Sequence, residues 1–86
     1  MTLKVYGWVD HRSEQHRLIV AAASFAEVCR IAEKAGLFKP DRRFTCTTGN
    51  PLELKVALAA PGTVFWRGIS DYDGEYRAYE ENADVG

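Results

Sequence analysis

Apolar residues form two runs near the start of the chain that predict a β-hairpin. Residues 3–10 (LKVYGWVD) place their aliphatic side chains on one face of a strand. Residues 11–16 (HRSEQH) are all polar and indicate a turn, while residues 17–23 (RLIVAAA) are almost continuously apolar, which is typical of a central strand buried on both faces. We expect the two runs to pair in antiparallel. Gly7 inside the first run indicates a bulge or a close backbone approach.

A capping box opens the first predicted helix. The Ser24 hydroxyl can accept a hydrogen bond from the backbone N–H of Glu27, and the Glu27 carboxylate can accept one from the N–H of Ser24. Apolar residues then recur at helical spacing up to residue 35. Gly36 is suited to the left-handed conformation that ends a helix. The pattern predicts a helix over residues 24–35.

A second helix is predicted after Asn50. Asn50 is a preferred N-cap, Pro51 suits the first helical position, and Glu53 completes a second capping box. The helix is expected to end at residues 61–62 (PG). Five residues at helical spacing form its apolar side: Leu52, Leu54, Val56, Leu58 and Ala59.

Further strands are predicted over residues 44–48, 63–69 and 75–80, where β-branched and aromatic residues gather. The elements follow the order β-β-α-β-α-β, with residues 75–80 as a further strand. This order predicts an α+β fold, in which two helices cover one face of a mostly antiparallel sheet of four or five strands. Residues 1–86 are expected to form a single small domain, with a frayed end at residues 81–86.

The composition is ordinary for a folded protein, with 47% apolar and 27% charged residues. No apolar run approaches the ~18–20 residues that span a bilayer, and the start does not resemble a signal peptide. We therefore expect a cytoplasmic protein without a membrane partner. The net charge of −1 is unevenly divided, because residues 71–86 carry −5 and residues 1–70 carry +4.

No local pattern predicts catalysis, a metal or a cofactor. The chain has no phosphate-binding glycine loop, and its two cysteines, Cys29 and Cys46, lack ligand spacing. We interpret both as reduced, buried thiols, with a disulfide between them as the minor alternative. A cryptic enzyme built on Cys46, or on the loop that contains His11 and His16, is the third hypothesis for function.

Aromatic residues and arginine near the predicted strands favour a protein-binding surface, because these residue types anchor interfaces. If both helices cover one face of the sheet, the other face would expose Tyr6 and Trp8. Acidic residues near the C-terminal end would then steer the partner electrostatically. The predicted partner-binding residues are Tyr6, Trp8, Trp66, Arg67, Asp71, Asp73, Glu75, Tyr76, Glu80 and Glu81.

The same surface permits an alternative, a small nucleic-acid-binding regulator. Its basic residues would be Arg12, Arg17, Arg42 and Arg43, with aromatic rings that stack on bases. These basic pairs are separated in sequence, and the near-neutral net charge disfavours a polyanion ligand. Nucleic acid is therefore the second choice of partner, and the oligomeric state, including a dimer, stays open.

Four segments carry a resemblance to a group of known proteins. The segments KVYGW, IVAAAS, TTGNPLE and PGTVFWR lie within residues 3–68. Together the pattern resembles small proteins of unassigned function that bacteriophages and other mobile elements encode. Inhibitors of host defence, including anti-CRISPR proteins, are similar in size, in forming single domains and in lacking catalytic motifs. The resemblance implies an accessory factor that binds and inhibits a host protein, and it assigns no role to any residue.

Overall fold

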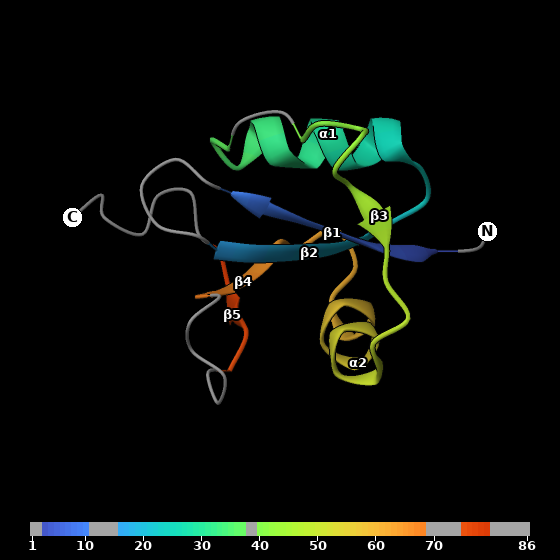
Figure 1. Ribbon diagram of the computed structural model, residues 1–86, viewed down its shortest axis with the longest axis vertical. Coiled ribbons are helices and arrows are strands. Elements are labelled where there is room, and N and C mark those ends of the chain that lie inside the picture. The colour runs from blue at the N-terminus through green and yellow to red at the C-terminus, as the bar shows by residue number, and fades with distance from the viewer. Residues whose placement is uncertain (1–2, 11–15, 38–39, 69–74, 80–86) are drawn as a thin grey trace.

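The computed structural model describes residues 3–10, 16–37, 40–68 and 75–79, which form one antiparallel sheet and two helices (Figure 1). This arrangement confirms the predicted α+β class and the broad order of the elements. Along the sheet the strands follow the order β3-β1-β2-β4-β5. In chain order the elements are β1 (Lys4–Asp10), β2 (His16–Ala22), α1 (Phe25–Lys34), β3 (Cys46–Thr47), α2 (Pro51–Ala59), β4 (Phe65–Gly68) and β5 (Arg77–Ala78).

The predicted hairpin is present as β1 and β2. Its antiparallel register runs from Lys4 opposite Ala22 to Asp10 opposite His16. Strand β4 pairs with the other edge of β2, so β2 is the central strand. This position explains the unbroken apolar run of β2, because both of its faces are buried.

The ends of α1 are those that the sequence predicts. The Ser24 side chain accepts a hydrogen bond from the backbone N–H of Glu27 at 3.3 Å. At the other end Gly36 has a φ of 81°, and the N–H of Leu37 donates to the carbonyl of Ala32 at 2.9 Å. This is the pattern of a Schellman cap, in which glycine adopts the left-handed conformation without a steric penalty.

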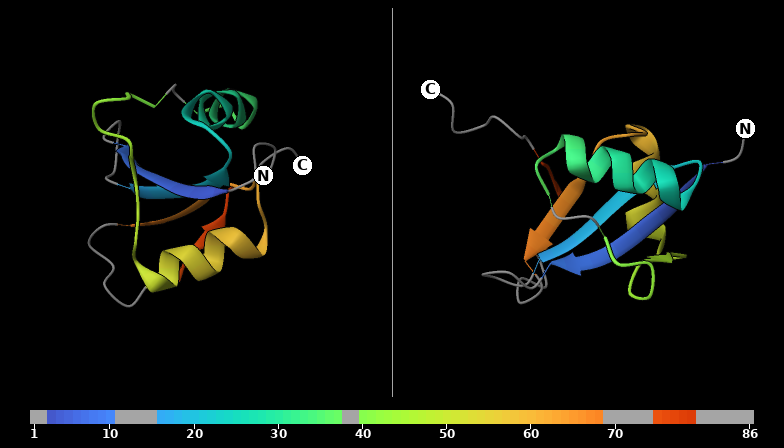
Figure 2. Two further views of the ribbon diagram at one scale, coloured as in Figure 1. Left: turned by 90° about the vertical axis from the view of Figure 1, so that its right-hand side faces the viewer. Right: turned by 90° about the horizontal axis from the view of Figure 1, so that it is seen from above.

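The two helices lie on opposite faces of the sheet, so the prediction that both cover one face is wrong (Figure 2). A central strand that is apolar on both faces must be packed against other elements on both. Helix α1 packs on one face of the sheet, and α2 packs on the other. The buried cluster beneath α1 comprises Trp8, Leu18, Val20, Ala22, Val28, Ala32, Leu37 and Val64. The smaller cluster beneath α2 comprises Val5, Ile19, Ala21 and Ala57.

Helix α1 therefore covers the face that was expected to be open. Trp8 is only 6% exposed and belongs to the core beneath α1. Tyr6 is half-buried against the same core. The expectation that both rings are exposed on an uncovered sheet face is thus wrong.

Some expectations fall on residues that the structure does not describe, namely the frayed end at residues 81–86 and the turn residues before His16. Neither α1 nor α2 has the length and hydropathy needed to cross a bilayer, and the ranges described above contain no other helix.

Candidate functional site

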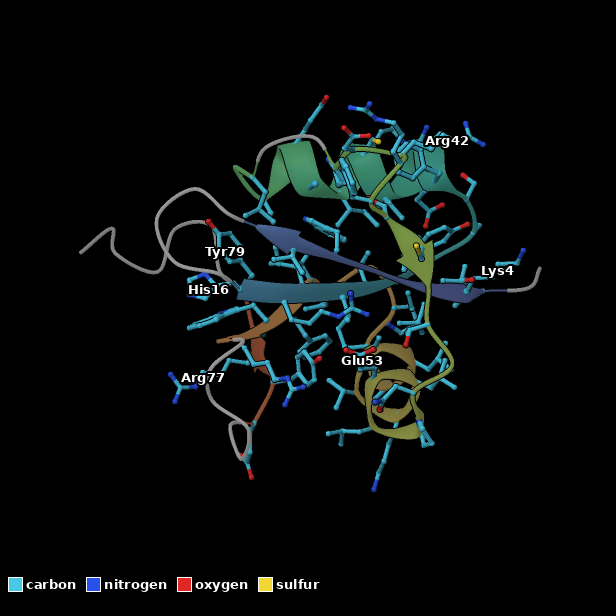
Figure 3. All side chains as sticks on the ribbon, viewed as in Figure 1. Lys4, His16, Arg42, Glu53, Arg77 and Tyr79 are labelled. Atoms are coloured by element: carbon cyan, nitrogen blue, oxygen red, sulfur yellow. The ribbon has the colours of Figure 1, made fainter. Side chains whose placement is uncertain are left out.

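A polar cluster lies between the sheet and α2, centred on Glu53. Glu53 is only 6% exposed, although it belongs to a short surface helix. The Arg17 side chain of β2 donates twice to its carboxylate, from Nε to Oε2 at 3.0 Å and from Nη2 to Oε1 at 3.1 Å. Figure 3 shows Glu53 directed from α2 toward the sheet. A bidentate arginine–carboxylate pair fixes the relative orientation of the two side chains in addition to the attraction between their charges.

Two hydroxyl groups complete the shell around the carboxylate. Thr48 Oγ1 donates to Glu53 Oε1 at 2.7 Å, and the Tyr76 hydroxyl donates to Oε2. Burial alone would raise the pKa of Glu53, but the hydrogen bonds from Arg17, Tyr76 and Thr48 outweigh burial and lower this pKa to about 2. The hydrogen bonds to Glu53 raise the pKa of Arg17, and burial together with the bond to Glu53 raises the pKa of Tyr76.

Gly7 of β1 provides the space that Arg17 occupies. A Cβ atom at position 7 would lie 2.3 Å from Nη2 and 2.5 Å from Cζ of Arg17. Only glycine at position 7 therefore allows the Arg17 guanidinium to lie over the backbone of β1 in its present position. The predicted close approach at Gly7 is made by a side chain of the neighbouring strand.

A second arginine, Arg67, borders the cluster and pairs with none of the carboxylates that the structure describes. In the β2–β4 register Arg67 lies directly opposite Arg17. Its guanidinium stacks over the Tyr76 ring, with Cζ 5.2 Å from the ring centroid. Arg67 Nε is buried and makes no hydrogen bond to any residue that the structure describes.

The chemistry of this cluster is that of an anchor. An ionised carboxylate with a pKa of about 2 is a weak base, and it holds no proton to donate near neutral pH. Both of its oxygens already accept hydrogen bonds. Glu53 therefore fastens α2 to the sheet. The sequence pattern instead predicts that its carboxylate takes part in a capping box. The cap itself is made by Asn50, whose side chain accepts from the N–H groups of Leu52 and Glu53.

Anchoring through Glu53 sets which side of α2 meets solvent. Glu53 and Ala57 are its buried residues, whereas Leu52 is 53% exposed and Leu58 is 44% exposed. The expected apolar side of the helix is thus turned outward in part. We call the exposed residues of this helix the α2 outer face: Pro51, Leu52, Lys55, Leu58 and Ala59.

The residues predicted to bind a partner do not form one surface. Trp66 is half-buried beneath α1, with the His16 ring at a centroid distance of 4.8 Å and Arg77 over it at 5.8 Å. Arg67 and Tyr76 lie in the Glu53 cluster, on the opposite face of the sheet. Glu75 is exposed. The predicted residues Asp71, Asp73, Glu80 and Glu81 lie outside the described part of the chain.

A second exposed surface lies beside the N-terminal end of α1. Phe44 is 70% exposed, with Arg43 over its ring at 5.5 Å, and Arg42 stacks over Phe25 at the same distance. Arg43 also pairs with Asp41 at 3.0 Å. Figure 3 places Arg42 on the α1 side of the sheet, away from α2. Phe25, Arg42, Arg43 and Phe44 are named the β3-side surface, after the strand that follows them.

The arginines proposed to bind nucleic acid also do not form one surface. Arg42 and Arg43 share the β3-side surface. Arg17 is directed into the Glu53 cluster, so it is not available to a phosphate backbone. Arg12 falls in a segment without a described position.

Both cysteines are free thiols, and the described part of the chain contains no group of side chains able to hold a metal ion. Cys29 is buried, as expected, but Cys46 is exposed because β3 is a two-residue strand at the sheet edge. Three His, Cys, Asp or Glu side chains never gather closely enough there to hold a metal ion. His11 is outside these residues.

An open cleft of about 350 Å³ is lined by Ile31, Lys34, Ala35, Gly62, Thr63, Val64 and Tyr79.

The chain has no match among known proteins in three comparisons. No protein-family model matches the sequence, and neither a curated protein nor a solved structure matches it.

Proposed function

We propose that this chain is a non-catalytic protein-binding module that works by stoichiometric contact through the α2 outer face. One observation carries the proposal. Helix α2 turns Glu53 and Ala57 toward the sheet while Leu52 and Leu58 face solvent. A surface helix ordinarily directs its large apolar residues inward only, whereas α2 has apolar residues on both sides, since Leu54 and Val56 pack against the core. A helix that is apolar on all sides is usually covered on all sides.

The energetics favour an external cover for this face. Complete burial of a leucine contributes about 1.5–3 kcal/mol, so covering the exposed half of Leu52 or Leu58 contributes about 1 kcal/mol each. The Glu53 anchor holds α2 without these leucines. The outward leucines can therefore contribute to binding while the domain keeps its own stability.

The resemblance to phage and mobile-element proteins supplies the proposed biological setting. In this proposal the partner is a host protein, such as a CRISPR-type defence component, and binding inhibits or modulates it. The acidic residues of the segment 71–86 increase the association rate with a partner that carries a basic region. This steering is separate from the α2 outer face, whose one charged residue is Lys55.

Affinity capture with the full chain tests the proposal. Wild-type protein should recover a defined protein in fixed stoichiometry from extract of the host cell, at low and at moderate salt. The double variant L52Q/L58Q should lose that protein while its fold, followed by circular dichroism, is unchanged. The matched control F44Q removes an exposed apolar side chain from the β3-side surface and should keep the partner. Recovery of nothing by the wild type, or equal recovery by L52Q/L58Q, would contradict the proposal.

A second candidate function is supported by the β3-side surface. Phe44 is exposed with Arg43 over its ring, and Arg42 lies over the neighbouring Phe25, an arrangement suited to stacking on an unpaired base and contacting its phosphate. Under this alternative, a single-stranded oligonucleotide binds with an affinity that falls steeply with salt, and F44A or R42A/R43A weakens it at least tenfold. A gel shift that shows no band at low ionic strength excludes this candidate.

A further inference from the structure

We infer that α2 inserts as a helix into an apolar groove of a different protein, and that a carboxylate of that protein pairs with Lys55. This inference rests on the proposed function and names the kind of partner. It starts from the position of Lys55, which lies at the middle of the nine-residue helix. On the α2 outer face the exposed Leu52 and Leu58 lie on either side of it along the chain.

The position of Lys55 disfavours a second copy of the chain as the occupant. A two-fold symmetric pair of α2 helices centred on the outer face brings each residue near the midpoint close to its own symmetry mate. The two Lys55 ammonium groups would then meet in the middle of an apolar contact. Like charges at such a place oppose association, whereas a carboxylate there would satisfy the ammonium.

The size of the face also argues against a flat contact. A nine-residue helix is about 14 Å long and about 10 Å wide, so a flat partner would contact only its crest. A concave groove covers more of the helix, because its walls reach the flanks as well as the crest.

The flanks of α2 are suited to such walls. Leu54 and Val56, on either side of the outer face, pack against the core beneath α2 but stay only partly buried. Figure 2 shows α2 standing out from the sheet as a separate layer. A groove that encloses Leu52 and Leu58 would therefore also meet Leu54 and Val56. This is the helix-in-groove mode of recognition, with α2 as the inserted helix.

Zero-length cross-linking tests the inference. A carbodiimide joins an amine to a carboxylate only when the two are in contact, so it should form an amide between Lys55 and an Asp or Glu of the captured partner. Tryptic mass spectrometry would locate the bond. Lys4 and Lys34, which lie on other elements, serve as internal controls and should give at least tenfold less adduct.

Two variants complete the experiment. K55R keeps the positive charge but cannot form the amide, so it should retain capture and lose the adduct. L52Q/L58Q should lose both. An adduct between two copies of the chain, or one on Lys4 or Lys34 in place of Lys55, would overturn the inference. If the wild type captures its partner through the α2 outer face but Lys55 gives no adduct, the inference fails and the proposed function stands. If the wild type captures nothing, both fail.

Discussion

Glu53 of α2 and Arg17 of β2 form a two-point ion pair that sets the rotation of α2 about its own axis. The two side chains are 36 positions apart in sequence and meet through hydrogen bonds of 3.0 and 3.1 Å. Because Glu53 faces the sheet, Leu52 and Leu58 face outward. The stability of the domain and its proposed binding surface therefore depend on the same pair.

Replacement of Glu53 by glutamine should lower the free energy of unfolding by about 2–3 kcal/mol. Loss of one partner of a fully buried pair costs about 3–5 kcal/mol, and the Arg17 side chain is 28% exposed, so part of this cost is screened. Urea denaturation at pH 7 measures the change. The exposed variant L58Q is the control and should change stability by less than about 0.5 kcal/mol. Equal losses in the two variants would contradict the anchoring role.

Stability should also fall at acid pH because of Glu53. Its pKa is lowered from 4.5 to about 2 in the folded chain, so its contribution is fully present above pH 4.5. That contribution disappears as the pH falls from 4.5 toward 2, and it amounts to at most about 3 kcal/mol. Denaturation of wild type and E53Q across this range checks the prediction. The difference in stability between them should shrink as the pH falls, and a constant difference would rule out the charge as its source.

The sequence predicted α1 and the hairpin well, because their determinants are local. Ser24 and Gly36 lie at the two ends of α1, and both act as the motifs indicate. The predicted central strand is β2. The same apolar run implied cover on both faces of the sheet, yet helix periodicity carries no information about which face a helix will cover. The side of the sheet that α2 occupies therefore had to come from tertiary structure.

Gly7 should be required only while Arg17 is present. In the wild type, G7A forces the guanidinium away from Glu53, because the added Cβ would lie 2.3 Å from Arg17 Nη2. The variant should lose about 1–3 kcal/mol of stability. In an R17A background the three closest contacts of the added Cβ are removed, and alanine is a better strand residue than glycine by about 0.5–1 kcal/mol. G7A should therefore be neutral or stabilising there, as a double-mutant cycle would show. The same loss in both backgrounds would exclude this explanation.

Two leucines of opposite orientation provide a further test. Leu18 is buried in the core beneath α1, whereas Leu58 lies on the α2 outer face. L18A should cost about 2–5 kcal/mol because it leaves a cavity. L58A should cost less than about 1 kcal/mol, since much of its side chain already contacts water. Thermal or urea denaturation of the isolated chain measures both. A cost for L58A that matches L18A would mean that Leu58 belongs to the core.

The candidate site was harder to predict because its residues come from distant segments. Glu53 satisfies a capping-box pattern, so its sequence context gave no reason to expect burial. Gly7 was the available signal, since a glycine inside a strand indicates that another group approaches closely. That signal does not identify Arg17 as the group. The exposure of Leu52 and Leu58 follows from the Arg17–Glu53 pair, so it could not be read from the apolar spacing of α2 alone.

The titration of the Glu53 carboxylate tests the inward orientation of this residue most directly. Carbon-13 NMR of the side-chain carboxyl, assigned with E53Q, reports its protonation in the folded protein. We expect a midpoint near pH 2 in the wild type, and a higher midpoint in Y76F, which removes one of the hydrogen bonds to the carboxylate. A wild-type midpoint near the ordinary value of 4.5 would contradict the anchor and, with it, the outward orientation of the leucines.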